Sequence, residues 1–94
     1  MRLAFEWDDH KAQVNLRRHG VDFVDAAGAF FDPCGFELLD DREDYGEDRF
    51  RLIGIAHGRL LLVVYTERRG TIRIISARAA NHKERKTYEN AYRR

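Results

Sequence analysis

The sequence predicts an α+β fold: two helices, then an antiparallel sheet, then a third helix. The first observation is an apolar stripe at helical spacing within residues 22–31. The second is the unbroken apolar run Leu60–Tyr65, which is typical of a central strand covered on both faces. The third is a pair of short glycine turns, His57-Gly58 and Arg69-Gly70, which predict a hairpin on each side of that strand.

The first strand and helix follow from the residues near the N-terminus. Leu3–Trp7 is expected to form a short strand. Asp8 offers a side-chain oxygen as N-cap of a helix from about Asp9 to His19. Gly20 suits the C′ position of this helix, because glycine adopts the left-handed conformation at little cost. The helix has few apolar residues, so we expect it to lie half exposed.

A second helix is expected after Asp22, which can cap it. Its stripe consists of Phe23, Ala26, Ala27, Phe30 and Phe31. Asp32-Pro33 ends it, because the residue before proline avoids helical angles. The remaining strands are expected at Phe36–Leu39, Arg49–Ala56, Arg59–Arg68 and Thr71–Ala77, and a last helix from Asn81 or His82 to about Tyr92. The acidic, polar residues 40–48 predict an exposed loop.

Length and composition limit the classes of protein. A chain of 94 residues predicts one domain over 1–94. The single cysteine, Cys34, forms no internal disulfide, and the four histidines lack metal-ligand spacing, so neither a metal site nor a cofactor is expected. No apolar run approaches the ~20 residues of a membrane helix. The N-terminal residues turn acidic too early for a signal peptide, so we expect a cytoplasmic protein without a membrane partner.

The charge is unevenly distributed along the chain. Residues 1–67 hold 8 Lys and Arg against 14 Asp and Glu, whereas residues 68–94 hold 9 against 2. Such a split indicates a polyanionic partner for the basic part. A solvated, arginine-rich surface is the alternative interpretation.

The two tight turns also predict the strand register. Arg68 pairs with Thr71, and Arg51 with Val64; continued alternation pairs Val64 with Ile75 and puts Arg78 opposite Leu61. The face expected to pack on the first two helices carries Phe50, Leu52, Leu61, Val63, Tyr65, Ile72 and Ile74. The other face carries Arg49, Arg51, Thr66, Arg68 and Arg73 at one end and Ile53, Leu62 and Ile75 toward the other.

Converging arginines on one sheet face repel one another unless anions lie between them. Guanidinium groups bind phosphate in a bidentate fashion, so a phosphodiester backbone fits this face. Two alternatives stay open: an acidic protein partner, and internal ion pairs with the 40–48 loop and Glu67.

His19, at a helix C-terminus, is either a structural cation or a general acid–base group. Trp7 is either a packing residue or a base-stacking one.

At this point the residues resemble a known family, the BrnT toxins. The motifs that carry the resemblance are Phe5-Glu6-Trp7-Asp8, Lys11, Asn15-Leu16-Arg17-Arg18-His19-Gly20-Val21 with Phe23 and Ala26, Asp32-Pro33, Glu47-Asp48-Arg49-Phe50, Ile53-Gly54, Leu62–Arg68, Ile72–Arg78, Glu84-Arg85 and Tyr88. Each motif is weak by itself, but their order along nearly the whole chain is specific.

The resemblance implies a RelE-like fold and a ribonuclease toxin of a type II toxin–antitoxin system, neutralised by a BrnA-type antitoxin. By motif, it assigns functional positions to Arg68 and Arg78, with Trp7 and His19 as companions. Combined with the register, the candidate catalytic residues are Arg68, Arg78, Arg49 and His19, and the candidate RNA-binding residues are Arg51, Arg73, Trp7, Lys83 and Arg85.

The expected reaction is metal-independent RNA cleavage that blocks translation. The ribose 2′-hydroxyl attacks the adjacent phosphate, and arginines orient the backbone and stabilise the developing charge. The sequence leaves the proton carrier open among His19, Glu67, Tyr65 and solvent. DNA contact is expected only through the antitoxin, because no helix-turn-helix pattern is present. Exposed Leu, Ile or Tyr on the sheet face and last helix are expected to add apolar contacts to the antitoxin. The alternative function is a non-catalytic module whose arginine face docks an acidic partner.

Overall fold

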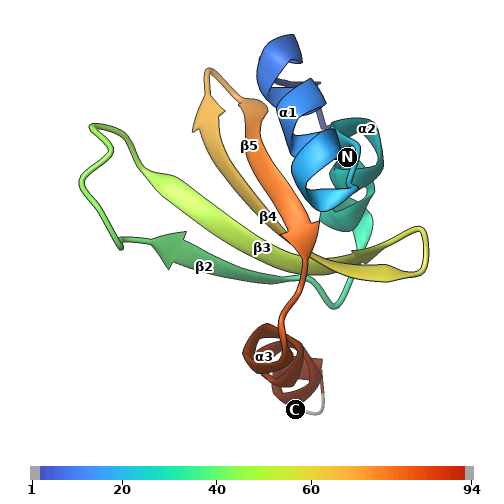
Figure 1. Cartoon of the computed structure of the whole chain (residues 1–94). Coiled ribbons are helices and arrows are strands. Elements are labelled where there is room, and N and C mark those ends of the chain that lie inside the picture. Colours follow the sequence, from blue (N-terminus) through green and yellow to red (C-terminus); the bar gives the residue numbers. More distant parts are fainter. Residues whose placement is uncertain (1–2, 93–94) are drawn as a thin grey trace.

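The computed structural model describes residues 3–92 and confirms a mixed α+β fold (Figure 1). One sheet has the strand order β1-β5-β4-β3-β2, in which β1 runs parallel to β5 and the other pairs are antiparallel. The elements are β1 Phe5–Glu6, α1 Asp9–His19, α2 Phe23–Ala27, the 3₁₀ helix η1 Gly28–Phe31, β2 Phe36–Asp40, β3 Arg49–Ala56, β4 Arg59–Arg68, β5 Thr71–Ala79 and α3 His82–Tyr92. No helix of residues 3–92 is long and apolar enough to cross a membrane.

The ends of α1 follow the predicted chemistry. The Asp8 carboxylate accepts a hydrogen bond from the Lys11 backbone N–H at 3.0 Å. Gly20 adopts a φ of 68°, and its N–H donates to the Leu16 carbonyl at 2.9 Å. Both caps fix where α1 begins and ends, and Gly20 then turns the chain toward α2.

The second predicted helix is shorter than its apolar stripe. The α-helical part, α2, ends at Ala27, and residues 28–31 continue as η1. Phe23 and Ala26 are buried and Phe30 packs on the core, but Phe31 is 62% exposed. The expectation that Phe31 belongs to the buried stripe was wrong, because a 3₁₀ helix turns in 3.0 residues rather than 3.6 and rotates Phe31 away from the sheet.

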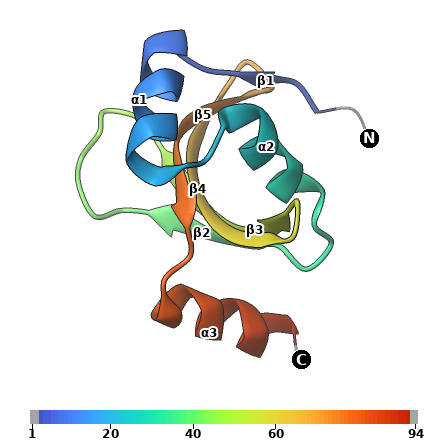
Figure 2. The same ribbon diagram turned by 45° about the vertical axis from the view of Figure 1, so that its right-hand side comes forward.

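One face of the sheet, the helix face, packs against α1 and α2 (Figure 2). Its buried strand residues are Leu52, Leu61, Val63, Tyr65, Ile72, Ile74 and Ala77, with Phe50 packed against them. The predicted helix face is confirmed, because the two hairpin turns set the pairs Ala56–Arg59 and Arg68–Thr71 as expected. The opposite surface is called the open face below.

A β-bulge changes the register midway along β5. Tyr65 pairs with Ile74, but the next pair is Val64 with Ser76, so Ile75 is the extra residue. The predicted pair of Val64 with Ile75 was therefore wrong, and Ser76 instead of Ile75 lies on the open face. Arg78 pairs with Leu62 rather than with Leu61. Since a shift of one residue changes the face, the bulge puts Arg78 on the open face.

The far end of the open face is covered by α3. Ile53, Leu60 and Leu62 are buried there, and Tyr88 of α3 packs against them with Leu38 and Ala80. The Tyr88 hydroxyl also donates to Asp32 at 2.7 Å. The apolar residues of this face that were expected to be exposed are thus covered by the chain's own last helix. The other end of the open face, which carries Arg49, Arg51, Arg68 and Arg73 and is called the arginine end below, lies beyond α3.

Gly54 marks the closest approach between β3 and η1. A Cβ atom at this position would lie 2.9 Å from the Ala29 carbonyl oxygen, which is backbone and cannot rotate away. We expect Gly54→Ala to destabilise the protein by about 2 kcal/mol, because the added methyl overpacks the core. Urea unfolding measures this loss. Gly28→Ala is the matched control and should change the free energy of unfolding by less than ~0.5 kcal/mol, because its Cβ meets Ala56 only at an ordinary 3.4 Å. Equal effects of the two changes would contradict the close approach.

Candidate functional site

Three rows of side chains cross the open face. The row nearest the 40–48 loop holds Asp40 and Arg49 as one cross-strand pair and Thr66 and Arg73 as another. The next row runs Leu38–Arg51–Val64–Ser76, and the third runs Phe36–Ile53–Leu62–Arg78. Cross-strand partners point to the same face. Arg68, two residues beyond Thr66 on β4, shares the face by alternation, so the open face gathers five arginines, namely Arg49, Arg51, Arg68, Arg73 and Arg78.

Most of these arginines contact an internal carboxylate. Glu47 accepts a hydrogen bond from Arg68 at 3.0 Å and lies 3.6 Å from the Arg49 Nε atom. Glu6, on β1, pairs with Arg73 at 2.7 Å. The hydrogen bond from Arg68 lowers the pKa of Glu47 below its ordinary value, so this carboxylate is charged at neutral pH. The predicted alternative of internal ion pairs is thus correct for part of the cluster.

Arg51 is the exception among the five. Its Nε atom is buried and has no hydrogen-bond partner, as is also true of the Arg49 Nε atom, but among the described residues no ion pair joins Arg51 to a carboxylate. The negative charges of Asp40 and Glu84 act on it only through space. Three carboxylates, Glu6, Glu47 and Glu84, contact the other four guanidinium groups, so the face keeps an excess of positive charge. An unpartnered guanidinium in the middle row is a ready donor for an anion.

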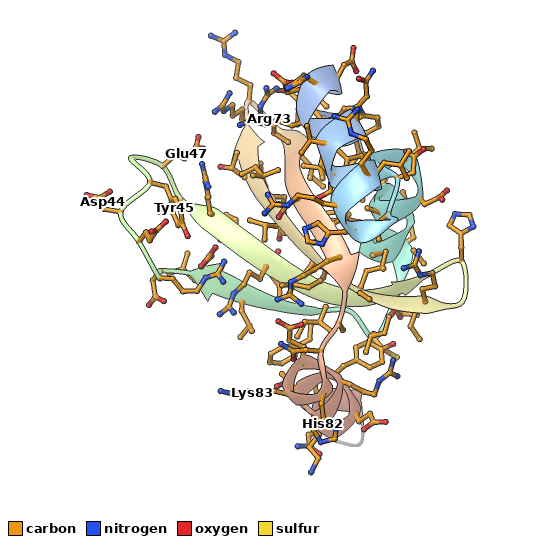
Figure 3. The ribbon with its side chains drawn as sticks, in the orientation of Figure 1. Asp44, Tyr45, Glu47, Arg73, His82 and Lys83 are labelled. Atoms are coloured by element: carbon orange, nitrogen blue, oxygen red, sulfur yellow. The ribbon has the colours of Figure 1, made fainter. Side chains whose placement is uncertain are left out.

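The loop after β2 folds back over the row that holds Asp40 and Arg49. Asp40 is 3% exposed and accepts two hydrogen bonds from Arg42, at 2.6 and 2.9 Å. Those hydrogen bonds lower the pKa of Asp40. The Arg49 guanidinium lies 4.1 Å above the centre of the Tyr45 ring, a cation–π contact. Tyr45 and Glu47 therefore border the arginine cluster, and Figure 3 shows both on the segment between β2 and β3.

Arg78 is held by α3. Its guanidinium donates two hydrogen bonds to Glu84, both at 2.8 Å. Glu84 also accepts from the Asn81 backbone N–H at 2.9 Å, while Asn81 accepts from the Glu84 N–H at 2.8 Å. This reciprocal pair is a capping box at the start of α3. One carboxylate thus both starts the helix and fastens it to the sheet.

Acid should weaken the attachment of α3. Burial alone would raise the pKa of Glu84, but hydrogen bonds from Arg78 and Asn81 lower it below its ordinary 4.5. A lowered folded-state pKa stabilises the fold above the unfolded-state value, and this contribution is lost as the pH falls through the folded-state pKa. We expect the urea midpoint to fall more steeply between pH 6 and pH 3 in the wild type than in Glu84→Gln. The same steepness in both would contradict the assignment to Glu84.

The other predicted site residues lie away from the arginines. Trp7 packs edge-on against Phe23 at 6.0 Å between ring centres, on the helix face. His19 is exposed at the end of α1 and lines a groove beside β5. Lys83 and Arg85 are exposed on α3, and Figure 3 shows Lys83 at the opposite end of the molecule from Arg73. The structure therefore brings together the five arginines but not Trp7, His19, Lys83 or Arg85.

Two of the predicted proton carriers lie on the wrong side of the sheet for the arginine cluster. Tyr65 is 4% exposed and packs between Phe30 and Phe50. Glu67 pairs with Ile72, a residue of the helix face. Glu47, which the sequence reasoning did not single out, is the carboxylate that contacts two of the clustered guanidiniums. Its position directly before Asp48-Arg49 was the one signal that could have suggested it.

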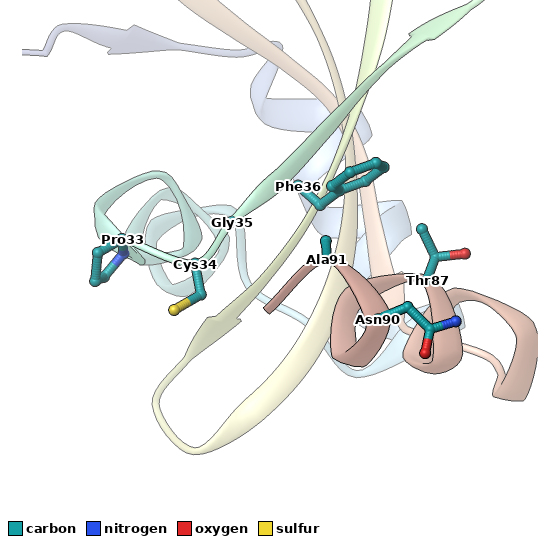
Figure 4. A pocket seen from close by; sticks show the side chains of 7 residues that line it. All are labelled: Pro33, Cys34, Gly35, Phe36, Thr87, Asn90 and Ala91. Atoms are coloured by element: carbon teal, nitrogen blue, oxygen red, sulfur yellow. The ribbon is translucent and has the colours of Figure 1, made fainter. Parts of the chain in front are cut away.

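A larger hollow of about 730 Å³ lies elsewhere, between the start of β2 and α3. Its lining includes Cys34, Phe36, Thr87 and Asn90, and no charged side chain (Figure 4). Its size does not make it the functional site, because its lining offers no charged side chain to bind or cleave RNA. Within residues 3–92, no three His, Cys, Asp or Glu side chains are grouped as metal ligands.

The fold and the cluster define a class: a small α+β protein in which one sheet face carries more guanidinium groups than internal carboxylates to pair with them. The family model described as ribonuclease toxin, BrnT, of type II toxin-antitoxin system matches residues 7–84, and the chain belongs to this family. No curated protein matches the chain. Membership makes it a ribonuclease toxin with RNA as target and an antitoxin as partner. The matched range includes all five clustered arginines.

Proposed function

We propose that this protein is a metal-independent endoribonuclease whose active surface is the arginine end of the open face. The observation that carries the proposal is Arg51, which no ion pair joins to a carboxylate of residues 3–92 and which lies in the row between that of Arg49 and Arg73 and that of Arg78. We infer a RelE-like arrangement from α1 and α2 on one sheet face and α3 across the end of the other. Cleavage of the RNA blocks translation. We infer that the protein acts in the cytoplasm, where this RNA lies.

The reaction requires one bond to form and one to break. The 2′-oxygen attacks phosphorus, the bond from phosphorus to the 5′-oxygen breaks, and a 2′,3′-cyclic phosphate and a 5′-hydroxyl result. Arg51 and Arg49 orient the phosphodiester, while Arg68, whose side chain is 52% exposed at the rim, stabilises the charge on the phosphoryl oxygens. We propose that Glu47 accepts the proton that the 2′-hydroxyl loses, and that solvent supplies the proton that the 5′-oxygen gains as it leaves. The lowered pKa of Glu47 makes it a weak base, which predicts a modest rate.

The remaining arginines bind RNA away from the scissile phosphate. Six residues along β4 separate the partner of Arg78 from Arg68, which is about 20 Å at ~3.3 Å per residue. Both groups therefore cannot contact one phosphate. Arg73 and Arg78 bind neighbouring parts of the backbone, and Arg78 does so after Glu84 releases it. His19 also lies away from the arginine cluster, at the end of α1, so we assign it to RNA binding and not to catalysis.

We infer that the antitoxin is of the BrnA type and that acidic side chains on it cover the arginine face. The internal contacts of Glu6, Glu47 and Glu84 support this inference, since they are carboxylates that already fit these guanidiniums. The toxin contacts DNA only through the antitoxin. Co-purification with the product of the neighbouring reading frame tests the partnership.

The cleavage assay uses purified protein and a single-stranded RNA of mixed sequence in the presence of EDTA. We expect 5′ fragments that end in a 2′,3′-cyclic phosphate or a 3′-phosphate. A 2′-deoxy nucleotide at the mapped cleavage site should block that cut, because the attacking hydroxyl is missing. Intact RNA, or cleavage that ignores the 2′-deoxy substitution, would contradict the mechanism.

A second function is favoured by the same carboxylate contacts. A non-catalytic module would use the open face only to bind an acidic segment of a partner. Its expected result is intact RNA together with tight, salt-sensitive binding to the antitoxin. The two functions are thus separated by the RNA assay, not by binding to the antitoxin.

A further inference from the structure

A second basic surface lies at the edge of the sheet, between α1 and β5. Among residues 3–92, β1 pairs with Ile72 and Arg73 of β5, and no other strand of this part of the chain lies beside that edge of β5. Instead, α1 lies along this edge, and the two elements leave a groove of about 210 Å³. Its polar lining consists of Lys11, Asn15, Arg18, His19 and Ser76.

The β5 bulge shapes the groove. Ile75, the extra residue of the bulge, lines the groove, and Ser76 returns to the open face opposite Val64. Ser76 therefore belongs both to the groove and to the row that contains Arg51. The groove and the arginine cluster are parts of one continuous surface that crosses the edge of β5.

The charge of the groove differs from that of the open face. Three basic side chains line it, from Lys11, Arg18 and His19, and no carboxylate does. No ion pair joins Lys11 or Arg18 to an acidic group within residues 3–92, although Asp8 attracts Lys11 through space. The Asn15 amide is already used by Val21 and Ala77. The free donors of the groove are therefore the Lys11 and Arg18 cations, the His19 ring and the Ser76 hydroxyl.

We propose that this groove is a second phosphate subsite, which binds single-stranded RNA where it leaves the arginine face. The inference rests on the proposed function and adds the path of the substrate. Arg51 and Ser76 lie two strand spacings apart, about 10 Å at ~4.8 Å each, and α1 lies one element further. The RNA segment that leaves the arginine face at this edge thus crosses β4 and β5, and its flanking phosphate contacts Arg18 and Lys11.

The test is the salt dependence of RNA binding. A 12-nucleotide RNA with 2′-O-methyl riboses cannot be cleaved, and fluorescence anisotropy at several NaCl concentrations gives the slope of log K against log salt. Each phosphate contact contributes about 0.7 to this slope for single strands. We expect Arg18→Ala to lower the slope by about 0.7 and Lys11→Ala with Arg18→Ala by about 1.4. The affinity should fall several-fold for each contact removed.

Arg17→Ala is the matched control, because Arg17 is an exposed neighbour on the same helix that does not line the groove. Its slope should stay within 0.2 of the wild type. Unfolding midpoints of the Lys11, Arg17 and Arg18 variants should agree with the wild type, since these side chains are exposed. If Arg18→Ala behaves like Arg17→Ala while Arg51→Met weakens binding, the groove is not a subsite and the proposed function stands. If the wild type neither binds nor cleaves RNA, the proposed function itself is wrong.

Discussion

Arg51→Met should reduce RNA cleavage by about two orders of magnitude without loss of stability. No carboxylate of residues 3–92 forms an ion pair with Arg51, so the change breaks none there, and the methionine retains the apolar stem beside Leu38 and Val64. Removal of one preorganised donor from a site of developing charge costs about 10²–10³ in rate. The initial rate on a fluorogenic RNA, measured with the urea unfolding curve, checks both parts of the expectation.

The control for this change is Arg59→Met. Arg59 belongs to the same sheet, but its guanidinium donates to the Gly20 carbonyl at 3.1 Å, away from the open face. Its cleavage rate should remain within twofold of the wild type. A folded Arg51→Met protein with undiminished cleavage would exclude the open face as the active surface. A loss of growth arrest in cells should accompany the loss of cleavage.

Asn15→Leu should have the largest effect on stability, about 4 kcal/mol. Asn15 is 6% exposed, and its amide donates to the carbonyls of Val21 and Ala77 at 3.0 and 2.8 Å. Its Oδ1 atom accepts from the Ala77 N–H at 3.1 Å. Leucine fills the space but leaves these buried backbone groups unpaired, at about 1–3 kcal/mol each. This loss is a large part of the 5–15 kcal/mol typical of a domain.

Urea unfolding followed by the fluorescence of Trp7 measures the effect. Gln13→Leu is the matched control, because Gln13 is exposed on the same helix. It should change the free energy of unfolding by less than ~0.5 kcal/mol. Asn15→Asp tests the donors separately, since aspartate keeps the acceptor for Ala77 but has no N–H for the two carbonyls. A loss below 1 kcal/mol in Asn15→Leu would show that α1 is not fastened to β5 by this amide.

Local chemistry was enough to predict most elements from the sequence. Asp8 and Gly20 set the ends of α1 because a capping oxygen and a left-handed residue are needed there whatever the helix packs on. The turns at His57-Gly58 and Arg69-Gly70 set two hairpins, and their positive φ angles explain why such short turns suffice. The hairpins in turn fixed which residues share the helix face.

The site was predictable only in part. The arginines of β3, β4 and the start of β5 were placed on one face by alternation, because the register near a turn follows from the turn itself. Their carboxylate partners were not, except in kind: Glu6 is 67 residues from Arg73, and Glu84, although only six residues from Arg78, lies in a different element. Only pairing of β1 with β5 and docking of α3 bring these carboxylates into contact.

By itself, the sequence determined the order of elements, the helix face and the gathering of arginines near the hairpin turns, because these depend on contacts between residues close in the chain. The tertiary structure decided the rest. The bulge at Ile75 moved Arg78 to the open face, and the open edge of β5 brought α1 beside it. A single extra residue in a strand has no local signature, since it is stabilised by packing between segments that lie far apart in sequence.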